Sequence, residues 1–161
     1  MKQTNYYHAF NKGENVIFRD VDDFITFNNK LAIAAYHANI GILAFAIMST
    51  HFHAIIEAID ESAIDKFLEL LSKVYSIHYG RKYGPASKKL FRMSTVVVEP
   101  SSLETEMLYV LKNPVHHYVD YTPLSYEFCS AAYMFMDELL PKSRLDAIES
   151  GFRKVKDLGV R

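Results

Sequence analysis

A chain of 161 residues, half of them hydrophobic, is long enough for one domain with a proper core, which excludes a disordered chain. The 18 basic and 19 acidic residues leave a formal net charge of −1, so overall charge predicts no nucleic-acid partner and any basic surface must be local. The single Cys129 excludes a disulfide framework and a multi-cysteine zinc site. With no signal segment and no apolar run of membrane-spanning length, we expect a cytoplasmic protein without a membrane partner.

The first third of the chain predicts a strand, a helix and a hairpin. Residues 6–10 have strand-forming content and end at a turn signal. A helix is expected from about Asp20, because apolar residues then recur at three- and four-residue steps and acidic residues suit a helix N-terminus. An apolar strand at 42–48, a polar turn at Ser49-Thr50 and a second strand at 51–59 follow.

A second helix, a strand, a third helix and two further helices are predicted in the rest of the chain. A second helix over 61–83 is stopped by Gly84-Pro85, and a β-branched strand covers 94–99. A third helix should begin at Ser102 and end around Asn113, because the residue before a proline is pushed out of the α region. Further helices are expected over 130–140 and 143–158.

This order predicts an α+β fold of the ferredoxin-like, split βαβ type. We expect a four-stranded antiparallel sheet with helices on one face, plus C-terminal helices. The whole chain, 1–161, is predicted to be one domain with its core at about 6–114 and a helical tail at about 130–158.

Two histidines stand at the start of the second hairpin strand. Because successive side chains of a strand point to opposite faces, His51 and His53 share one face and Phe52 takes the other. Two neutral imidazoles side by side can bind one metal ion. The pair lacks a third ligand, however, and two histidines on the wet face of a hairpin would give the same pattern. The tripeptide alone leaves both interpretations open.

A basic and aromatic segment covers residues 72–92. It contains six of the 18 basic residues and no acidic residue, and tyrosines spaced four apart lie along one side of the predicted helix. This composition suits a phosphate backbone with stacked bases. A solvated basic loop, after a helix whose tyrosines pack on the sheet, fits equally well. The candidate DNA-binding residues are Lys73, Arg81, Lys82, Lys88, Lys89 and Arg92.

The third predicted helix carries a phenol and a carboxamide one turn apart. Tyr109 and Asn113 are four residues apart, so their side chains are neighbours on the helix surface. As a pair they indicate little, since tyrosine is an ordinary core residue and asparagine before proline is an ordinary helix end.

In combination, however, the motifs resemble the HUH single-tyrosine transposases, and most closely the REP-associated tyrosine transposases of bacteria. They are YHAFNKG at 7–13 with IFRD at 17–20, AIMSTHFH at 46–53, YVLKNPV at 109–115 and YEFCS at 126–130, in the order that the family has them. The chain departs from the family's pattern at Ser49-Thr50, where Pro-Asn is usual, at Lys12 and His116-His117, and in its charge of −1.

The resemblance implies a site and a reaction. His51, His53 and Asn113 are similar to the family's metal ligands, for Mg²⁺ or Mn²⁺, and Tyr109 is similar to its nucleophile. The implied substrate is single-stranded DNA with a hairpin, cleaved and rejoined through a covalent 5′-phosphotyrosine, with Asn11 and Lys12 near the bound strand. The protein would act near the nucleoid, as a monomer or homodimer. The alternative is a catalytically idle, domesticated protein that binds hairpin DNA and regulates.

Overall fold

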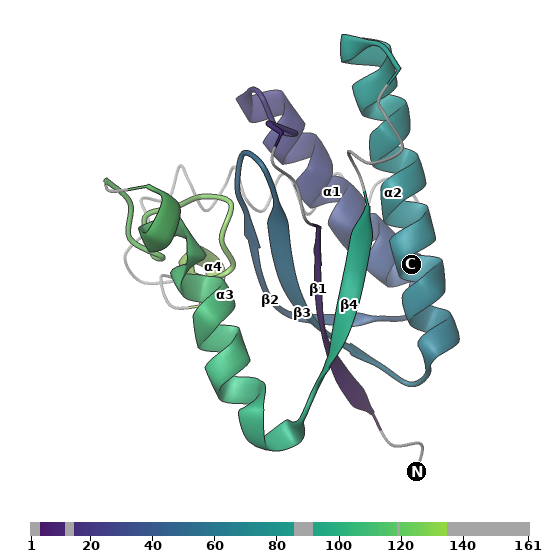
Figure 1. The fold of residues 1–161 in the computed structure, drawn as a ribbon, viewed down its shortest axis with the longest axis vertical. Coiled ribbons are helices and arrows are strands. Elements are labelled where there is room, and N and C mark those ends of the chain that lie inside the picture. The colour runs from purple at the N-terminus through teal and green to yellow at the C-terminus, as the bar shows by residue number, and fades with distance from the viewer. Residues whose placement is uncertain (1–3, 12–14, 86–91, 119, 135–161) are drawn as a thin grey trace.

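Four strands form one antiparallel sheet in the order β2-β3-β1-β4 (Figure 1). The computed structural model describes residues 4–11, 15–85, 92–118 and 120–134. The strands are β1 (Asn5–Asn11), β2 (Gly41–Ile47), β3 (Phe52–Ala58) and β4 (Met93–Val98). Helix α1 (Val21–Ala38) connects β1 to β2, and α2 (Glu61–Tyr83) connects β3 to β4. This strand order and connectivity confirm the predicted ferredoxin-like fold class.

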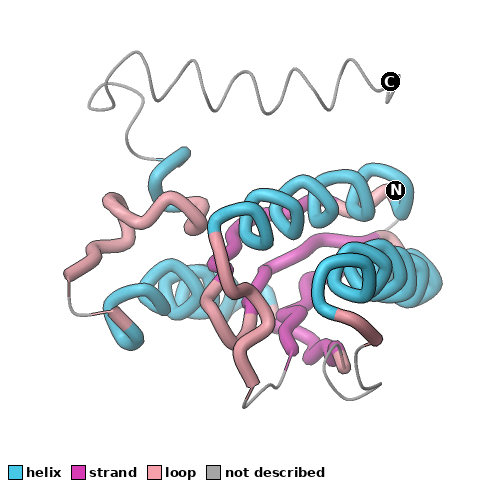
Figure 2. Tube along the Cα trace, turned by 90° about the horizontal axis from the view of Figure 1, so that it is seen from above, coloured by secondary structure: helices cyan, strands magenta, loops and turns pink. Residues whose placement is uncertain are grey.

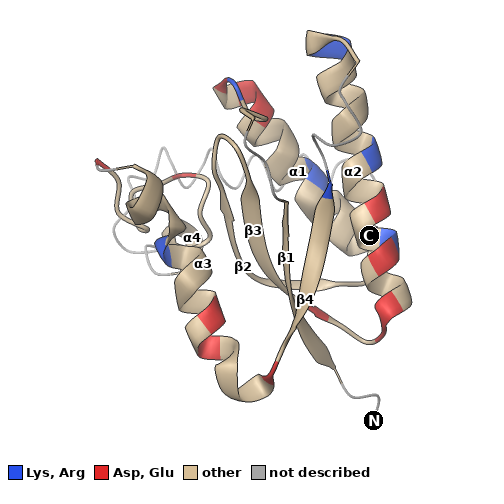
Figure 3. Ribbon diagram, viewed as in Figure 1, with Lys and Arg blue, Asp and Glu red and all other residues tan. Residues whose placement is uncertain are grey.

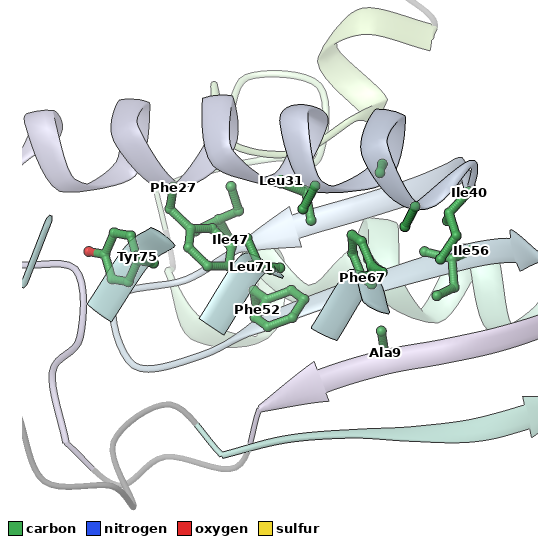
Figure 4. Close-up of a cluster of buried hydrophobic side chains, with 14 of the residues drawn as sticks. Ala9, Phe27, Leu31, Ile40, Ile47, Phe52, Ile56, Phe67, Leu71 and Tyr75 are labelled. Carbon is green, nitrogen blue, oxygen red and sulfur yellow. The ribbon is translucent and has the colours of Figure 1, made fainter. Parts of the chain in front are cut away.

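Helices α1 and α2 cover one face of the sheet and enclose the main core (Figures 1 and 4). Their buried residues recur every four positions, as in the fully buried Phe67, Leu71 and Tyr75 of α2. Phe27 of α1 and Phe52 of β3 pack with ring centroids 5.0 Å apart. Each of these large side chains contributes about 1.5–3 kcal/mol of burial free energy to this face.

The third helix lies on the other face of the sheet, a position that no local sequence pattern predicts. α3 (Leu103–His117) follows a short 3-10 turn, Pro100–Ser102, and packs on β2 and β3, so the sheet separates it from α1 and α2 (Figure 2). A second apolar cluster fills this contact, made of residues from the strands, α3 and the segment after it: Ala44, Ala46, Met48, Ile55, Val110, Leu111, Tyr126, Cys129 and Ala131. We call this side the α3 face of the sheet.

The prediction that the third helix ends around Asn113-Pro114 is wrong, because α3 continues through Pro114 to His117. Proline disfavours a helical residue before it, but here both Asn113 and Pro114 are buried against the sheet. The turn beyond is closed by the backbone N–H of Tyr118, which donates to the Pro114 carbonyl at 2.8 Å. Tertiary packing therefore outweighs the local preference, and it adds one turn to the helix.

The segment after α3 covers the outer edge of β2. The backbone N–H of Ile47 donates to the Phe128 carbonyl, and that of Ser130 donates to the Phe45 carbonyl, each at 2.9 Å. A short helix, α4 (Ala131–Met134), follows and begins near the predicted residue 130. The predicted tail helix over 143–158 lies outside the described residues. No helix in the described ranges has the length and apolar content needed to cross a membrane.

The turn between β2 and β3 is tight and is held from several segments. Met48 and His51 exchange both backbone hydrogen bonds, at 2.7 and 3.3 Å, so the two residues between them form the predicted turn. The Ser49 carbonyl accepts from the backbone N–H groups of residues 17 and 18, at 2.8 and 3.0 Å. The Ser49 N–H donates to the Tyr118 hydroxyl at 3.1 Å. The turn is therefore fixed to both faces of the sheet.

The last residue of β1 adds a side chain to these restraints. Asn11 is 5% exposed, and its Oδ1 accepts from the backbone N–H of Phe52 at 2.8 Å. Its Nδ2 donates to the Thr50 carbonyl at 3.4 Å. The Asn11 side chain thus spans the junction between the turn and β3, and its polar atoms are directed inward.

We predict that Asn11→Ala lowers the free energy of unfolding by about 1–3 kcal/mol, because it leaves the buried Phe52 N–H without an acceptor. Urea unfolding followed by circular dichroism measures the loss. The matched control is Asn5→Ala, at the exposed start of the same strand, which should change the midpoint little. Equal midpoints for the two variants would contradict the structural role assigned to Asn11.

Candidate functional site

β3 and α3 bring the four residues of the predicted metal and tyrosine site together on the α3 face. The rings of His51 and His53 are 5.1 Å apart between centroids and nearly perpendicular, at 82°. His51 Nε2 lies 3.5 Å from Asn113 Oδ1. The Tyr109 ring lies 5.7 Å from the His53 ring at 83°, an edge contact. His51 just before β3, His53 in β3, and Tyr109 and Asn113 one turn apart on α3 therefore lie at one place on the α3 face.

The Asn113 carboxamide has a defined orientation. The side chain is buried, 3% exposed, and its Nδ2 donates to the Tyr109 carbonyl at 3.3 Å. That bond turns Oδ1, the metal-binding atom of a carboxamide, toward His51. On its other side, the His51 ring is held by a 2.8 Å contact between Nδ1 and the Thr50 hydroxyl. His51 Nε2 and Asn113 Oδ1 are thus both positioned by their neighbours.

Three further ionisable residues complete the site, and sequence reasoning did not assign them a role. His8 of β1 places Nε2 2.8 Å from His53 Nδ1, and its Nδ1 lies 3.3 Å from Glu106 Oε2. His117 places its ring 4.7 Å from that of His51. The signals were present in the sequence. Residues 106, 109, 113 and 117 follow helical spacing along one side of α3, and His8 alternates with the core residues of its strand.

Burial favours the neutral form of His8, His51 and His53. It lowers the pKa of His53 to about 3, with repulsion from His8, His51 and His117 adding to the effect. Burial also lowers the pKa of His51, against an opposing hydrogen bond from Asn113. The pKa of His8 is lowered by burial despite the nearby Glu106 carboxylate, which raises it. Neutral imidazole is the form that can bind a metal ion.

Two of the candidate donor atoms have a spacing that suits a divalent cation. Two ligands in adjacent positions around an octahedral cation, each bound at about 2.1 Å, lie roughly 3 Å apart. The 3.5 Å between His51 Nε2 and Asn113 Oδ1 is close to this spacing. Two imidazole nitrogens and one carboxamide oxygen would form a mixed nitrogen and oxygen set, a chemistry that suits Mn²⁺ or Mg²⁺.

The structure places the basic and aromatic residues of segment 72–92 in several different surroundings. Lys73, Arg81 and Lys82 lie on α2, across the sheet from the site, and Figure 3 shows acidic residues beside basic ones along this helix. Arg92 is exposed just before β4. Lys12, Lys88 and Lys89 lie outside the described residues. Tyr75 and Tyr79 are 0% and 6% exposed in the main core, so for these two the packing interpretation is confirmed and base stacking is excluded.

Lys82 is bound by carboxylates from the start of α1. Its Nζ lies 2.7 Å from Asp20, 3.1 Å from Asp22 and 3.0 Å from the fully buried Asp23. Donor atoms of Asp22, Asp23 and His78 lie within 4.8 Å of one another, a spacing that could hold a metal ion. The Lys82 ammonium already occupies that position, so we interpret this group as an ion-pair cluster.

Comparisons with known proteins show what this fold is similar to. No protein-family model matches the chain, and no curated protein matches it. The solved structure of a REP-associated tyrosine transposase bound to a REP hairpin is similar, with a TM-score of 0.59 and 12% identity over 87% of this chain and 83% of that chain. A proposed transposase from Deinococcus radiodurans R1 has a TM-score of 0.48 and 14% identity over 67% of this chain and 89% of that chain.

The chain therefore has the fold of a REP-associated tyrosine transposase. At 12% identity this likeness shows the shared fold alone, and the similarity extends over most of both chains. It supports the family resemblance read from the four sequence motifs. The roles of the individual site residues rest on their geometry.

The buried histidines predict a loss of stability in mild acid. Below the ordinary histidine pKa of 6.5, the unfolded chain binds a proton at His53 that the folded chain, with a pKa of about 3, does not. Each pH unit then costs up to about 1.4 kcal/mol, or about 2 kcal/mol between pH 6.5 and 5. His51 and His8 act in the same direction.

Urea unfolding at pH 7.5, 6.5, 5.8 and 5.0 measures this loss, in a range above the titration of ordinary carboxylates. His53→Asn should flatten the pH profile, whereas the control His37→Gln, an exposed histidine at the end of α1, should keep it. An unfolding free energy that stays constant from pH 7.5 to 5.0 would show that the site histidines are not held neutral.

Proposed function

We propose that this protein cleaves and rejoins single-stranded hairpin DNA through Tyr109, assisted by a divalent cation on His51, His53 and Asn113. One observation carries the proposal: a phenol, two neutral imidazoles and an oriented carboxamide oxygen converge on one face of the sheet. The shared fold supports it, since the REP-associated tyrosine transposase of that fold was solved bound to a REP hairpin.

Tyr109 has the placement that a nucleophile acting on a large substrate needs. The residue is 49% exposed on α3, while its ring centroid lies 5.7 Å from that of His53 and 6.0 Å from that of His8, both in T-shaped arrangements. The contacts restrict the ring, and the exposure leaves its hydroxyl accessible to a polynucleotide. Buried tyrosines of this chain, such as Tyr75 and Tyr126, lack that access.

In the proposed step, the Tyr109 oxygen attacks the scissile phosphorus and its proton leaves to solvent. The bond from phosphorus to the 3′ oxygen breaks, and that oxygen takes up a proton to become a free hydroxyl. The 5′ phosphate stays on Tyr109 as a phosphodiester, so the same step run backward by a 3′ hydroxyl rejoins the strand without a nucleotide cofactor.

A phenol is a weak nucleophile at neutral pH, so the phosphate must be made more electrophilic. A bound cation would supply this by polarising a non-bridging phosphate oxygen. The protein residues prepare the place: His51 and His53 present nitrogens from the strand side, and Asn113 presents an oxygen from the helix side. Asn113 lies one turn after Tyr109, so a single rigid helix holds both the nucleophile and a ligand.

DNA binding in this proposal depends on local basic residues, because the net charge is −1. Within the described residues, the exposed side chains of Lys73, Arg81 and Arg92 make none of the carboxylate contacts that hold Lys82. Asn11 is positioned to act indirectly, through the turn that it supports, because its own polar atoms are directed into the protein.

The decisive test is Tyr109→Phe. This variant should form no covalent protein–DNA adduct with a labelled hairpin oligonucleotide in Mn²⁺, while its affinity for the hairpin stays within about twofold of wild type. Tyr121→Phe is the matched control, because Tyr121 is a similarly exposed tyrosine, at 45%, outside the site. An adduct band on a denaturing gel with Tyr109→Phe would refute the assigned nucleophile.

The same assay separates the alternative function. A wild-type protein that binds the hairpin but forms no adduct at any Mg²⁺ or Mn²⁺ concentration would be a hairpin-binding regulatory protein of this fold. His51→Ala and His53→Ala should likewise lose the adduct and keep hairpin binding if the proposed reaction is correct.

Substitutions of Arg92 and Lys82 should have opposite effects on DNA binding and on stability. Arg92→Ala should weaken hairpin binding and reduce the slope of log affinity against log salt by about 0.7–1, with an unchanged urea midpoint. Lys82→Ala should lower the urea midpoint, because it leaves the buried Asp23 without its ammonium partner, and should leave the salt slope as it is. A reversed pattern would mean that Lys82 contacts DNA despite its ion pairs.

A further inference from the structure

A continuous chain of polar contacts next to Tyr109 links three residues from three elements: Glu106, His8 and His53. Glu106 Oε2 of α3 lies 3.3 Å from His8 Nδ1 of β1, and His8 Nε2 lies 2.8 Å from His53 Nδ1 of β3. The His8 side chain is 12% exposed and lies between the other two. Each nitrogen of the His8 ring therefore has one partner, and the chain ends at the imidazole of a proposed metal ligand.

The proton positions along this chain follow from its first member. A carboxylate oxygen accepts hydrogen bonds, so the 3.3 Å contact with Glu106 favours the form of His8 that carries its proton on Nδ1. A neutral His8 then has a lone pair at Nε2, which accepts a hydrogen bond from His53 Nδ1–H. His53 in turn is left with its lone pair at Nε2. A carboxylate two rings away thus determines which nitrogen of His53 is free to bind a cation.

We propose that Glu106 and His8 are positioning residues that hold His53 in the Nδ1–H tautomer, with Nε2 available to a divalent cation. For the cation this rests on the proposed function, whereas the tautomer is a property of the protein alone. Outer partners of this kind fix the ring orientation and tautomer of a metal-binding histidine, and their loss typically costs 10–100-fold in metal affinity.

The arrangement also links the helix that carries the nucleophile to the strand that carries the ligand. Glu106 lies on α3, three residues before Tyr109, so it occupies the same side of the helix. The contacts from Glu106 to His53 therefore fix α3 against β1 and β3 from the N-terminal side of Tyr109. Asn113 makes the corresponding contact with His51 from the C-terminal side, at 3.5 Å.

Glu106→Gln is the sharpest variant, because it keeps the size of the side chain and can reverse the protons. A glutamine amide that donates to His8 Nδ1 leaves the His8 proton on Nε2. That proton then points at His53 Nδ1 and forces the His53 proton to Nε2, the nitrogen needed by the cation. Because a glutamine can also present its oxygen, we expect a mixture of the two tautomers.

Two measurements test the proposal. In ¹⁵N-histidine-labelled protein without metal, long-range ¹H–¹⁵N spectra at pH 7.5 should show His53 as the Nδ1–H tautomer in wild type and as a mixture in Glu106→Gln. Titration of Mn²⁺ followed by electron paramagnetic resonance should show 10–100-fold weaker binding for Glu106→Gln. The control Glu104→Gln, an exposed acid two residues earlier on α3, should stay within twofold of wild type.

A double-mutant comparison distinguishes loss of the positioning role from a simple folding defect. In a His8→Phe background the connection is already broken, so adding Glu106→Gln should change Mn²⁺ affinity no further, provided that both proteins keep the wild-type circular dichroism spectrum. Additive losses would overturn the proposal, as would a wild-type-like His53 tautomer or Mn²⁺ affinity in Glu106→Gln. If wild type itself bound no Mn²⁺, the metal site of the proposed function would fail, and the tautomer spectra alone would decide the positioning role.

Discussion

The tight turn between β2 and β3 is the constraint on which the site depends. The Ser49 carbonyl and N–H are bound from opposite sides of the sheet, and Asn11 fixes the first residue of β3. In a strand, a slip of one residue moves every side chain to the other face. A slip here would bury the polar imidazole of His53 in the main core and expose Phe52 to the site. The backbone restraints at the turn therefore decide which face carries the chemistry.

The two faces of the sheet serve different physical purposes. The face under α1 and α2 is packed with large apolar and aromatic side chains, which provide the stability of the domain. The α3 face contains a smaller apolar cluster and, beside it, a group of imidazoles whose burial lowers their pKa values. Burying polar rings costs free energy unless each finds a partner, and the contacts to Glu106, Thr50 and Asn113 supply these partners. The apolar core under α1 and α2 thus provides stability that offsets the free-energy cost of burying the polar side chains of the α3 face.

Local patterns predicted much of this structure, and long-range contacts explain what they missed. Periodicity predicted the order of helices and strands along the chain and the core positions of α1 and α2, and alternation placed His51 and His53 on one face. Nothing local indicates that α3 crosses to the other face or that it continues through Pro114, because both follow from packing on β2 and β3. The contacts of His8 with Glu106 and His53 join three separate segments, so no single motif contains them. The neutralisation of Lys82 likewise comes from aspartates about 60 positions earlier.

That ion-pair cluster indicates from which side DNA would approach. The C-terminal part of α2 reads as basic and aromatic, yet Lys82 is bound by three aspartates, and Tyr83 donates to Asp23 at 2.7 Å. Arg19 stacks over the Tyr83 ring at 4.5 Å. These contacts hold the end of α2 against the start of α1. The charge of Lys82 is therefore largely neutralised within the protein. Tyr109 lies exposed on the opposite side of the sheet. In the proposed reaction, a substrate that reaches Tyr109 would therefore approach from the α3 face.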